Sequence, residues 1–200
     1  MVRTGRPRKF NREEAVSRAM MLFWEHGYDS TSLAELKKGM GGISSASFYA
    51  AFESKDALFK EVLARYLATF GQVSASLTDP SLSPRTAIEL TIRSSAKMQT
   101  EQTHPLGCLV VLSANTCSAD NVHIRELLTK ERAATRHKIY ACIKRAVMNE
   151  ELAESTDIAM LTTLFNTFLE GISTEARDGI PFEVINAAVT KLMEVWDMSK

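Results

Sequence analysis

Hydroxyl, aromatic and amino groups are concentrated in one short stretch, residues 43–59, which reads ISSASFYAAFESKDALF. Serine and tyrosine hydroxyls can donate hydrogen bonds to anionic oxygens, and the Lys55 ammonium adds a positive charge. The spacing places Lys55 at a helix N-terminus, where free N–H groups and the helix dipole also favour an anion. The stretch is therefore typical of a surface that binds a phosphate backbone. A pair of ordinary capped helices is the alternative.

The elements that position this stretch follow a helical period. Asn11 with Glu14 three residues later is typical of a capping box, and Gly27 is expected to end the helix that they open. A second helix is expected to begin at a cap formed by Thr31 or Ser32. After the third helix, a fourth carries an apolar stripe made of Phe59, Leu63, Tyr66 and Phe70.

The GMGG turn at residues 39–42 separates the second helix from a short third helix capped by Ser44. Short helix, glycine-rich turn and short helix together form the helix-turn-helix pattern. A helix that enters a DNA major groove, about 12 Å wide, needs small side chains on its leading face. Ser45, Ala46 and Ser47 meet that need, and the serine hydroxyls can donate to base edges or phosphates.

The segments FWEHGYDSTSLAEL and MGGISSASFYAAFESKDALF resemble the N-terminal domain of the tetracycline-repressor (TetR/AcrR) family, over roughly residues 10–63. The resemblance implies a dimeric, all-helical, ligand-responsive transcription factor. It implies that Thr31 and Lys55 hold phosphates and that Ser44 caps the recognition helix. The residues that it places along the DNA are Ser45, Ala46 and Tyr49.

Two departures from the family pattern bear on how DNA would be recognised. The turn before Ile43 is one glycine longer than usual, which is expected to loosen or rotate the recognition helix. Ser45, Ala50 and Ala51 stand where members often carry long polar side chains. Recognition is therefore expected to rely on DNA shape, phosphate contacts and an N-terminal arm.

That arm is residues 1–9, MVRTGRPRK, which carry four cations and no acid in a chain of zero net charge. Arg6 and Arg8 in GRPRK resemble a minor-groove arm that follows a narrow A·T groove. The alternative is a solvated terminus without a role in binding.

The composition narrows the class of protein. With 200 residues, 45% hydrophobic and 24% charged, the chain is a normal globular protein. Its longest aliphatic run, residues 109–112, is too short for a membrane span, and three cysteines do not suggest a disulfide scaffold. We therefore expect a cytoplasmic protein. No hydrolase, phosphate-loop, metalloprotease or dinucleotide motif occurs, so we expect neither an enzyme nor a cofactor.

Residues 71–200 are expected to form a second helical unit. The pattern predicts a loop at 76–85, a helix to about 102, a buried helix or strand at 107–114, and helices near 122–149, 156–176 and 182–197. The last two have wide apolar faces, which favours a homodimer joined through a four-helix bundle. A monomer core is the alternative.

The same unit is expected to hold a ligand pocket, although any one candidate could serve only as core packing. The candidates are Met98, Cys108, Leu109, Leu112, Ile139, Phe165 and Phe168. Cys108 admits further interpretations. Packing is favoured for its thiol. A redox or electrophile sensor is the alternative, and resembles TetR-family members with a cysteine in such a GCL segment. Metal binding with His104, Cys117 and His123 fits no compact zinc pattern.

The sequence thus predicts an all-α protein with a basic arm at 1–9, a helix-turn-helix domain at 10–56, a connecting helix at 57–70 and a ligand-binding and dimerisation domain at 71–200. The expected function is transcriptional repression, with release from a double-stranded DNA operator by an unknown small-molecule inducer. Remote alternatives are a helical interaction module without DNA binding and a cysteine-dependent enzyme.

Overall fold

A computed structural model describes residues 11–115 and 117–200, and this part of the chain contains helices and no strand. The all-α prediction is confirmed. The α-helices are α1 Arg12–Ser30, α2 Leu33–Gly39, α3 Ser45–Phe52, α4 Lys55–Ala68, α5 Pro84–Thr100, α6 Leu109–Asn115, α7 Val122–Met148, α8 Ile158–Arg177 and α9 Phe182–Asp197. Two 3₁₀ helices, η1 Phe70–Thr78 and η2 Ala119–Asn121, complete the order.

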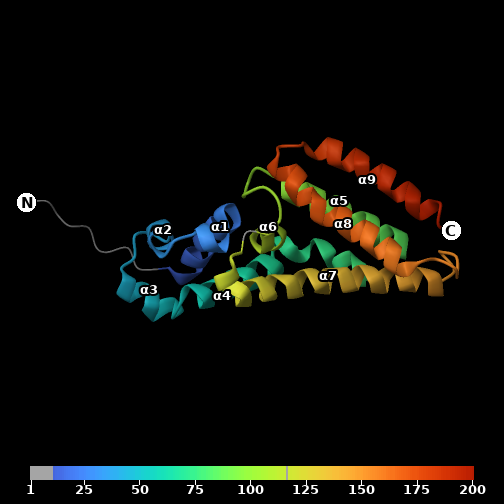
Figure 1. The fold of residues 1–200 in the computed structure, drawn as a ribbon. Coiled ribbons are helices and arrows are strands. Elements are labelled where there is room, and N and C mark those ends of the chain that lie inside the picture. The colour runs from blue at the N-terminus through green and yellow to red at the C-terminus, as the bar shows by residue number, and fades with distance from the viewer. Residues whose placement is uncertain (1–10, 116) are drawn as a thin grey trace, which may run out of the picture.

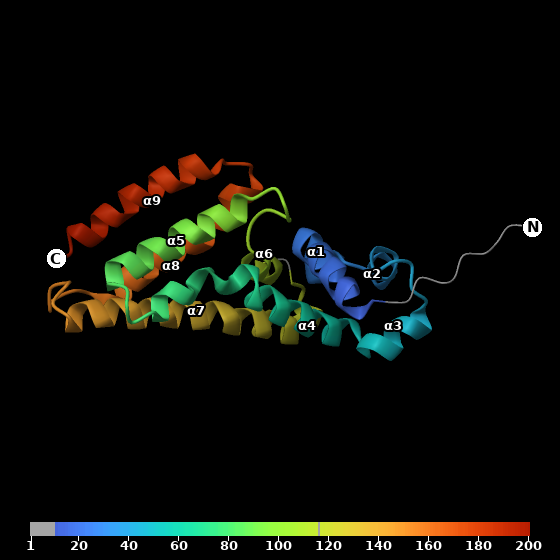
Figure 2. The same ribbon diagram turned by 180° about the vertical axis from the view of Figure 1, so that it is seen from behind.

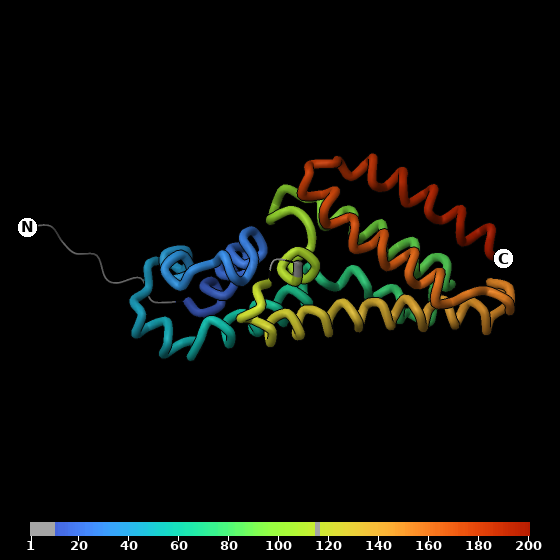
Figure 3. Tube along the Cα trace, in the orientation of Figure 1, coloured from blue at the N-terminus to red at the C-terminus, as the bar shows by residue number. Residues whose placement is uncertain are grey.

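The helices form two regions (Figure 1). We call α1–α4 the head and α5, α7, α8 and α9 the body. In Figure 1 the head lies at one end, and α7 and α9 form the two outer edges of the body with α5 and α8 between them. The short helix α6 lies where head and body meet, as the yellow-green coil in the middle of the chain trace shows (Figure 3).

Side-chain caps set the helix boundaries in the head. The Asn11 side chain accepts a hydrogen bond from the Glu14 N–H, which opens α1 as predicted. Ser32, rather than Thr31, caps α2 in a reciprocal capping box with Glu35. Gly27 interrupts the first helical stretch, in agreement with its predicted role. Its φ of 79° and ψ of 172° are not helical, and a short further stretch across this kink reaches Ser30.

Aromatic rings fill the head core. The Phe23 and Phe59 ring centroids lie 5.0 Å apart, and those of Trp24 and Tyr66 lie 4.8 Å apart, both edge to face. The cluster continues through Leu109 of α6 into the start of α7. Because α4 packs in this continuous core, motion of α6 or α7 can reach the helix-turn-helix.

The body has a separate apolar core between its helices. Its fully buried members include Ile88, Ile92, Ile143, Leu161, Phe165, Val189 and Trp196. Where the sequence predicts a loop at 76–85, the first residues belong to η1, which runs along α7 (Figure 2). A 3₁₀ helix of nine residues is unusually long, since its hydrogen-bond geometry is poorer than that of an α-helix.

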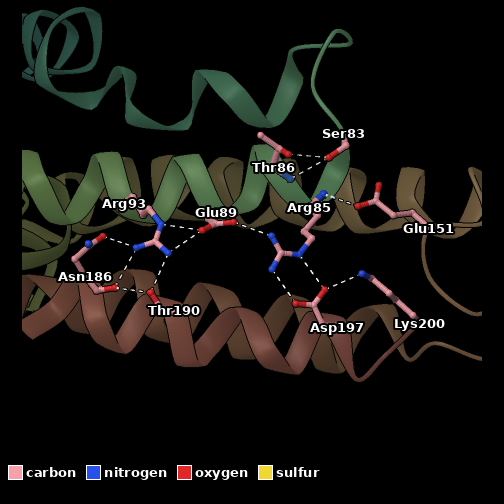
Figure 4. Close-up of polar contacts among 10 residues, drawn as sticks. All are labelled: Ser83, Arg85, Thr86, Glu89, Arg93, Glu151, Asn186, Thr190, Asp197 and Lys200. Atoms are coloured by element: carbon pink, nitrogen blue, oxygen red, sulfur yellow. Dashed lines mark hydrogen bonds and ion pairs between the residues drawn. The ribbon is translucent and has the colours of Figure 1, made fainter.

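A line of polar contacts, here called the α5–α9 seam, holds α9 against α5 (Figure 4). Arg85 donates to both carboxylate oxygens of Asp197, at 3.0 and 2.8 Å. Glu89 accepts from both Arg85 and Arg93. Arg93 also donates to the Asn186 side-chain oxygen, at 2.5 Å. Hydrogen bonds from Arg85 hold the pKa of Asp197 well below its usual range.

Candidate nucleic-acid interface and ligand cavity

Helix α3 buries one face and exposes the other. Phe48 and Phe52 are buried in the head core, as predicted. The Ser44 hydroxyl accepts a hydrogen bond from the Ser47 N–H at 3.1 Å, which confirms the predicted cap. The opposite face is exposed and consists of Ser45, Ala46, Ser47, Tyr49 and Ala50. Small and hydroxyl-bearing groups thus form a convex surface that fits a groove.

A lysine of α2 reaches this surface. The Lys37 ammonium donates to the Ser45 hydroxyl at 2.8 Å, across the turn that joins the two helices. The turn places Gly41 and Gly42 at φ values of 99° and 76°, a region that glycine adopts without strain. Sequence reasoning did not select Lys37. The signal was its place in the last turn of a helix that leads into a glycine-rich turn.

Lys55 begins α4 directly after its cap, Ser54. Its ammonium lies 4.2 Å from the centroid of the Tyr28 ring, which is a cation–π distance. Burial lowers the pKa of Lys55, and the nearby Asp29 and Asp56 carboxylates oppose that shift. The Tyr28 hydroxyl in turn donates to Asp56, which ties the end of α1 to the start of α4.

Thr31 does not lie at the surface. Its side chain is fully buried, and its hydroxyl donates to the Gly27 carbonyl at 2.6 Å, so the hydroxyl is not presented to a phosphate. The kink at Gly27 exposes that carbonyl to Thr31, which explains the difference from the sequence-based expectation. Arg6 and Arg8 lie outside the described residues.

The body contains a cavity of about 480 Å³, here called the body cavity, bounded by α4, η1, α5, α7, α8 and the start of α6. Met98 and Cys108, two of the pocket candidates from the sequence, line it. Its other apolar wall is made by Leu67, Val73, Val110, Val111 and Leu169.

The remaining pocket candidates do not line this cavity. Leu109 is buried in the core that joins α6 to the head, and Ile139 and Phe165 are buried in the body core. A side-chain methyl of Leu112 packs near Gly107. Phe168 lines a separate hollow of about 280 Å³ between α8 and α9. Apart from Phe168, these side chains fill space between helices rather than border an opening.

Polar side chains that the sequence did not single out lie in or beside the cavity wall. The Ser173 hydroxyl donates to the Gln99 side-chain oxygen at 2.7 Å, and the Gln99 amide donates to Ser95 at 2.7 Å. The Asn166 amide donates to a Glu170 carboxylate oxygen at 3.0 Å. Polar residues on helices are most often exposed to solvent, so the sequence pattern did not predict that these side chains point inward.

Both regions match known families. Residues 15–62 match the model for bacterial regulatory proteins of the tetR family, and residues 86–179 match the tetracyclin repressor-like C-terminal domain. The chain belongs to the tetR family. It is 30% identical to the HTH-type transcriptional repressor ComR of Escherichia coli K12, over 96% of this chain and 91% of that protein. It is 28% identical to the repressor BdcR of the same organism, over 92% and 87%.

A solved tetR-family structure has the same fold. It is a cysteine-substituted form of the regulator CifR in complex with 26 bp double-stranded operator DNA. It shares 37% sequence identity with this chain and aligns with a TM-score of 0.87, over 96% of this chain and all of that one. Among the described residues of this tetR-family chain, no helix is both long and apolar enough to cross a bilayer.

Cys108 is part of the cavity wall, and its sulfur accepts a hydrogen bond. The Tyr66 hydroxyl donates to its sulfur at 3.3 Å, and burial raises the pKa of Cys108. A thiol with a raised pKa carries little thiolate, which is the reactive form. The geometry therefore does not favour the cysteine-sensing alternative. In residues 11–115 and 117–200, no group of three or more His, Cys, Asp or Glu side chains is placed to hold a metal ion.

The cavity wall is joined to the head of this tetR-family fold by hydrogen bonds through Gly107. The Gly107 N–H donates to the Gln99 carbonyl at 2.9 Å, and the Gly107 carbonyl accepts from the Trp24 indole at 3.1 Å. Arg177 of α8 donates to the Trp24 carbonyl at 2.8 Å. The His104 ring stacks on Trp24 with centroids 4.5 Å apart. Trp24 thus contacts the body on several sides.

Proposed function

We propose that this protein is a homodimeric transcriptional repressor that binds a double-stranded DNA operator and is released by a small molecule. The main support for this proposal is the exposed face of the capped helix α3, which presents Ser45, Ser47 and Tyr49 beside the Lys37 ammonium. The names of ComR and BdcR as repressors and the operator complex of CifR support the same function.

In the proposed complex α3 enters the major groove. Ser45, Ala46 and Ser47 allow close approach, while Tyr49 and Lys55 hold phosphates on either side. Lys55 would leave the Tyr28 ring for a phosphate, and the helix dipole of α4 would add to the attraction. Short side chains on α3 favour recognition through DNA shape and backbone contacts, with residues 1–9 as a minor-groove arm.

The proposed dimer forms through α8 and α9. Large apolar side chains remain exposed there, with Met160 at 51% and Val184 at 56% exposure, beside the hollow lined by Phe168. A second copy would cover this surface and would place two heads for a twofold operator. Operator binding also implies the cytoplasmic location that the sequence predicts.

Release is proposed to begin in the body cavity. Tyr66 and Gln99 line it, Tyr66 belongs to α4, and Gln99 is joined through Gly107 to Trp24 of α1. A ligand that binds better to a conformation with a different head spacing would shift the population away from the DNA-binding form. The proposal needs no catalytic step.

Selection of bound duplexes from a random pool, followed by affinity measurements at several salt concentrations, tests the proposal. A specific, salt-dependent complex with a twofold site is expected. Lys55→Ala should weaken binding to all sequences and reduce the salt slope by about one unit. Lys144→Ala, an exposed change on α7 of the body, is the control and should leave the slope unchanged. Absence of a specific duplex would contradict the function.

A further inference from the structure

We infer that the body cavity takes a small molecule with an apolar body and a protonated amine, and that Glu170 and Asn166 bind the amine. The inference rests on the proposed function and names the class of its inducer. It comes from two residues of the cavity wall, a carboxylate without an ion-pair partner and an amide oxygen without a donor.

The cavity wall is mainly apolar. Aliphatic side chains from α4, η1, α6 and α8 line it, and Met98 contributes from α5. A volume of about 480 Å³ lies within the range of small-molecule sites, which are mostly apolar with a few fixed polar groups. The hydrophobic wall accounts for the body of the ligand, and the polar groups decide its headgroup.

Asn166 supplies an acceptor without a donor. Its side chain is 7% exposed and lines the cavity. Its amide nitrogen donates to Glu170, and this contact fixes the amide orientation because the side-chain oxygen would repel the carboxylate. No described residue donates to the remaining Asn166 oxygen. Because Asn166 lines the cavity, this oxygen is an acceptor that a donor group of a ligand can reach.

Glu170 supplies a negative charge without a cation. Its carboxylate is partly buried and lines the cavity, and no described Lys, Arg or His forms an ion pair with it. A carboxylate withdrawn from water is stabilised by a paired cation. Asn166 and Glu170 are four residues apart on α8 and so lie on one helix face. Together they present acceptors to a single donor-rich group.

Two cationic side chains, Arg132 and Lys138, also line the cavity, and neither forms an ion pair with Glu170. Lys138 donates to the Ser74 hydroxyl at 3.4 Å, and Arg132 donates to the Thr129 hydroxyl at 3.3 Å. Arg136 of α7 donates to the Thr163 hydroxyl of α8, so these two residues lie at the same height along the two helices. Glu170 lies seven residues from Thr163, which is roughly 10 Å along the helix toward the head. Lys138 lies beyond Arg136 in the opposite direction, whereas Arg132 lies one turn from Arg136 on the head side and donates to Thr129 rather than to Glu170.

Binding of matched probes to the full-length protein without DNA tests the inference. The probes are amines, alcohols and carboxylates built on the same short phenylalkyl and cyclohexylalkyl chains, and calorimetry reports their affinities. Amines are expected to bind most tightly. Glu170→Gln should weaken amine binding by about ten- to hundred-fold, the value of a hydrogen bond to a charged group. The alcohols should change little.

Glu126→Gln, an exposed change on α7, is the matched control and should leave amine binding intact. Circular dichroism checks that each variant folds. Tighter binding of carboxylates, which would assign Arg132 or Lys138 as the contact, overturns the inference. So does the absence of amine binding, or amine binding that Glu170→Gln leaves unchanged.

Operator release measured in parallel separates this inference from the proposed function. Amines that bind through Glu170 without releasing DNA would support the site and contradict ligand-responsive release. Release by a molecule that Glu170→Gln does not affect would support the function and contradict the amine class.

Discussion

The head and the body bury their side chains in opposite ways. In the head, Phe23, Trp24, Phe59 and Tyr66 contact one another ring to ring and are essentially inaccessible to solvent. In the body, hydroxyl and amide groups are buried around an opening of about 480 Å³. The head therefore has one well-defined packing, whereas the body keeps space that a ligand can fill.

This difference has an energetic consequence. Atoms that border a void lack dispersion partners on one side, so the cavity withholds stabilisation that close packing would supply. Of the four head rings, Tyr66 alone lines the cavity, so the aromatic head core has little of this deficit. A head that moves as a unit and a body that can repack are the two properties that release by a ligand requires.

The largest expected effect comes from emptying the head core. Phe59→Ala should lower the free energy of unfolding by about 3–5 kcal/mol, because it removes a fully buried ring. Met98→Ala, at the cavity wall, should lower it by less than about 2 kcal/mol, because that side chain is partly exposed and already borders an opening. Urea unfolding at equal protein concentration measures both. Equal losses would show that head and body are packed alike.

A smaller effect is expected where the two regions meet. Gly107 has a φ of 81°, and a Cβ there would lie 2.7 Å from a Leu112 methyl carbon and 2.9 Å from the Ser173 carbonyl oxygen. Gly107→Ala should therefore destabilise the fold by about 1–3 kcal/mol and loosen the Trp24 contact. Tryptophan fluorescence during unfolding reports both changes when it is measured in a Trp196→Phe background, which leaves Trp24 as the one tryptophan.

Gly41→Ala separates backbone strain from crowding in that result. Gly41 also has a positive φ, 99°, but a Cβ there would meet no atom within 4 Å. It should lose less stability than Gly107→Ala. If the two variants lose the same amount, the close approach at Gly107 has no role in joining head and body.

Much of the head could be predicted from the sequence because its signals are local. Caps such as Ser44 and the buried positions Phe48 and Phe52 follow from spacing along one helix. The break at Gly27 follows from its residue type, since glycine adopts a positive φ without strain, but the short helical stretch beyond it was not predicted. That kink also turned Thr31 inward, away from its expected role.

The body cavity was only partly predictable because a cavity depends on which side chains fail to meet. Apolar candidates such as Ile139 and Phe165 proved to be core, since apolar periodicity marks burial rather than an opening. The groups that distinguish the wall, Gln99 and Asn166, are polar and gave no sequence signal. Their inward direction follows from the crossing of α5 and α8, which is a tertiary property.

The next prediction concerns the reactivity of Cys108, which lies between the head and the body. Because burial raises the pKa of Cys108, and the hydrogen bond from Tyr66 only partly offsets that shift, alkylation by iodoacetamide at neutral pH should be slow compared with a free thiol. Peptide mass mapping over a pH series measures the rate at this residue. Tyr66→Phe removes the hydrogen bond and keeps the ring. Fast alkylation of the wild-type thiol, with release from DNA that Cys108→Ser abolishes, would restore the sensing alternative.

The smallest expected effect lies in the α5–α9 seam, where charges at the surface rather than rings join two helices. Hydrogen bonds from Arg85, and then from Lys200, lower the pKa of Asp197 in the folded protein. Its value in the unfolded chain is about 3.9, so the unfolded state takes up the proton first as the pH falls. The stabilisation is therefore present above about pH 4 and is lost below it.

Asp197→Asn should lower the urea midpoint slightly at neutral pH, and its curve should approach that of the wild type in acid. Added salt should shrink the difference, since exposed ion pairs are screened. Asp178→Asn, an exposed change after α8, should show no such pH dependence. If Asp197→Asn leaves the midpoint unchanged at every pH, apolar packing alone holds α9 in place, and the body resembles the head more closely than the seam implies.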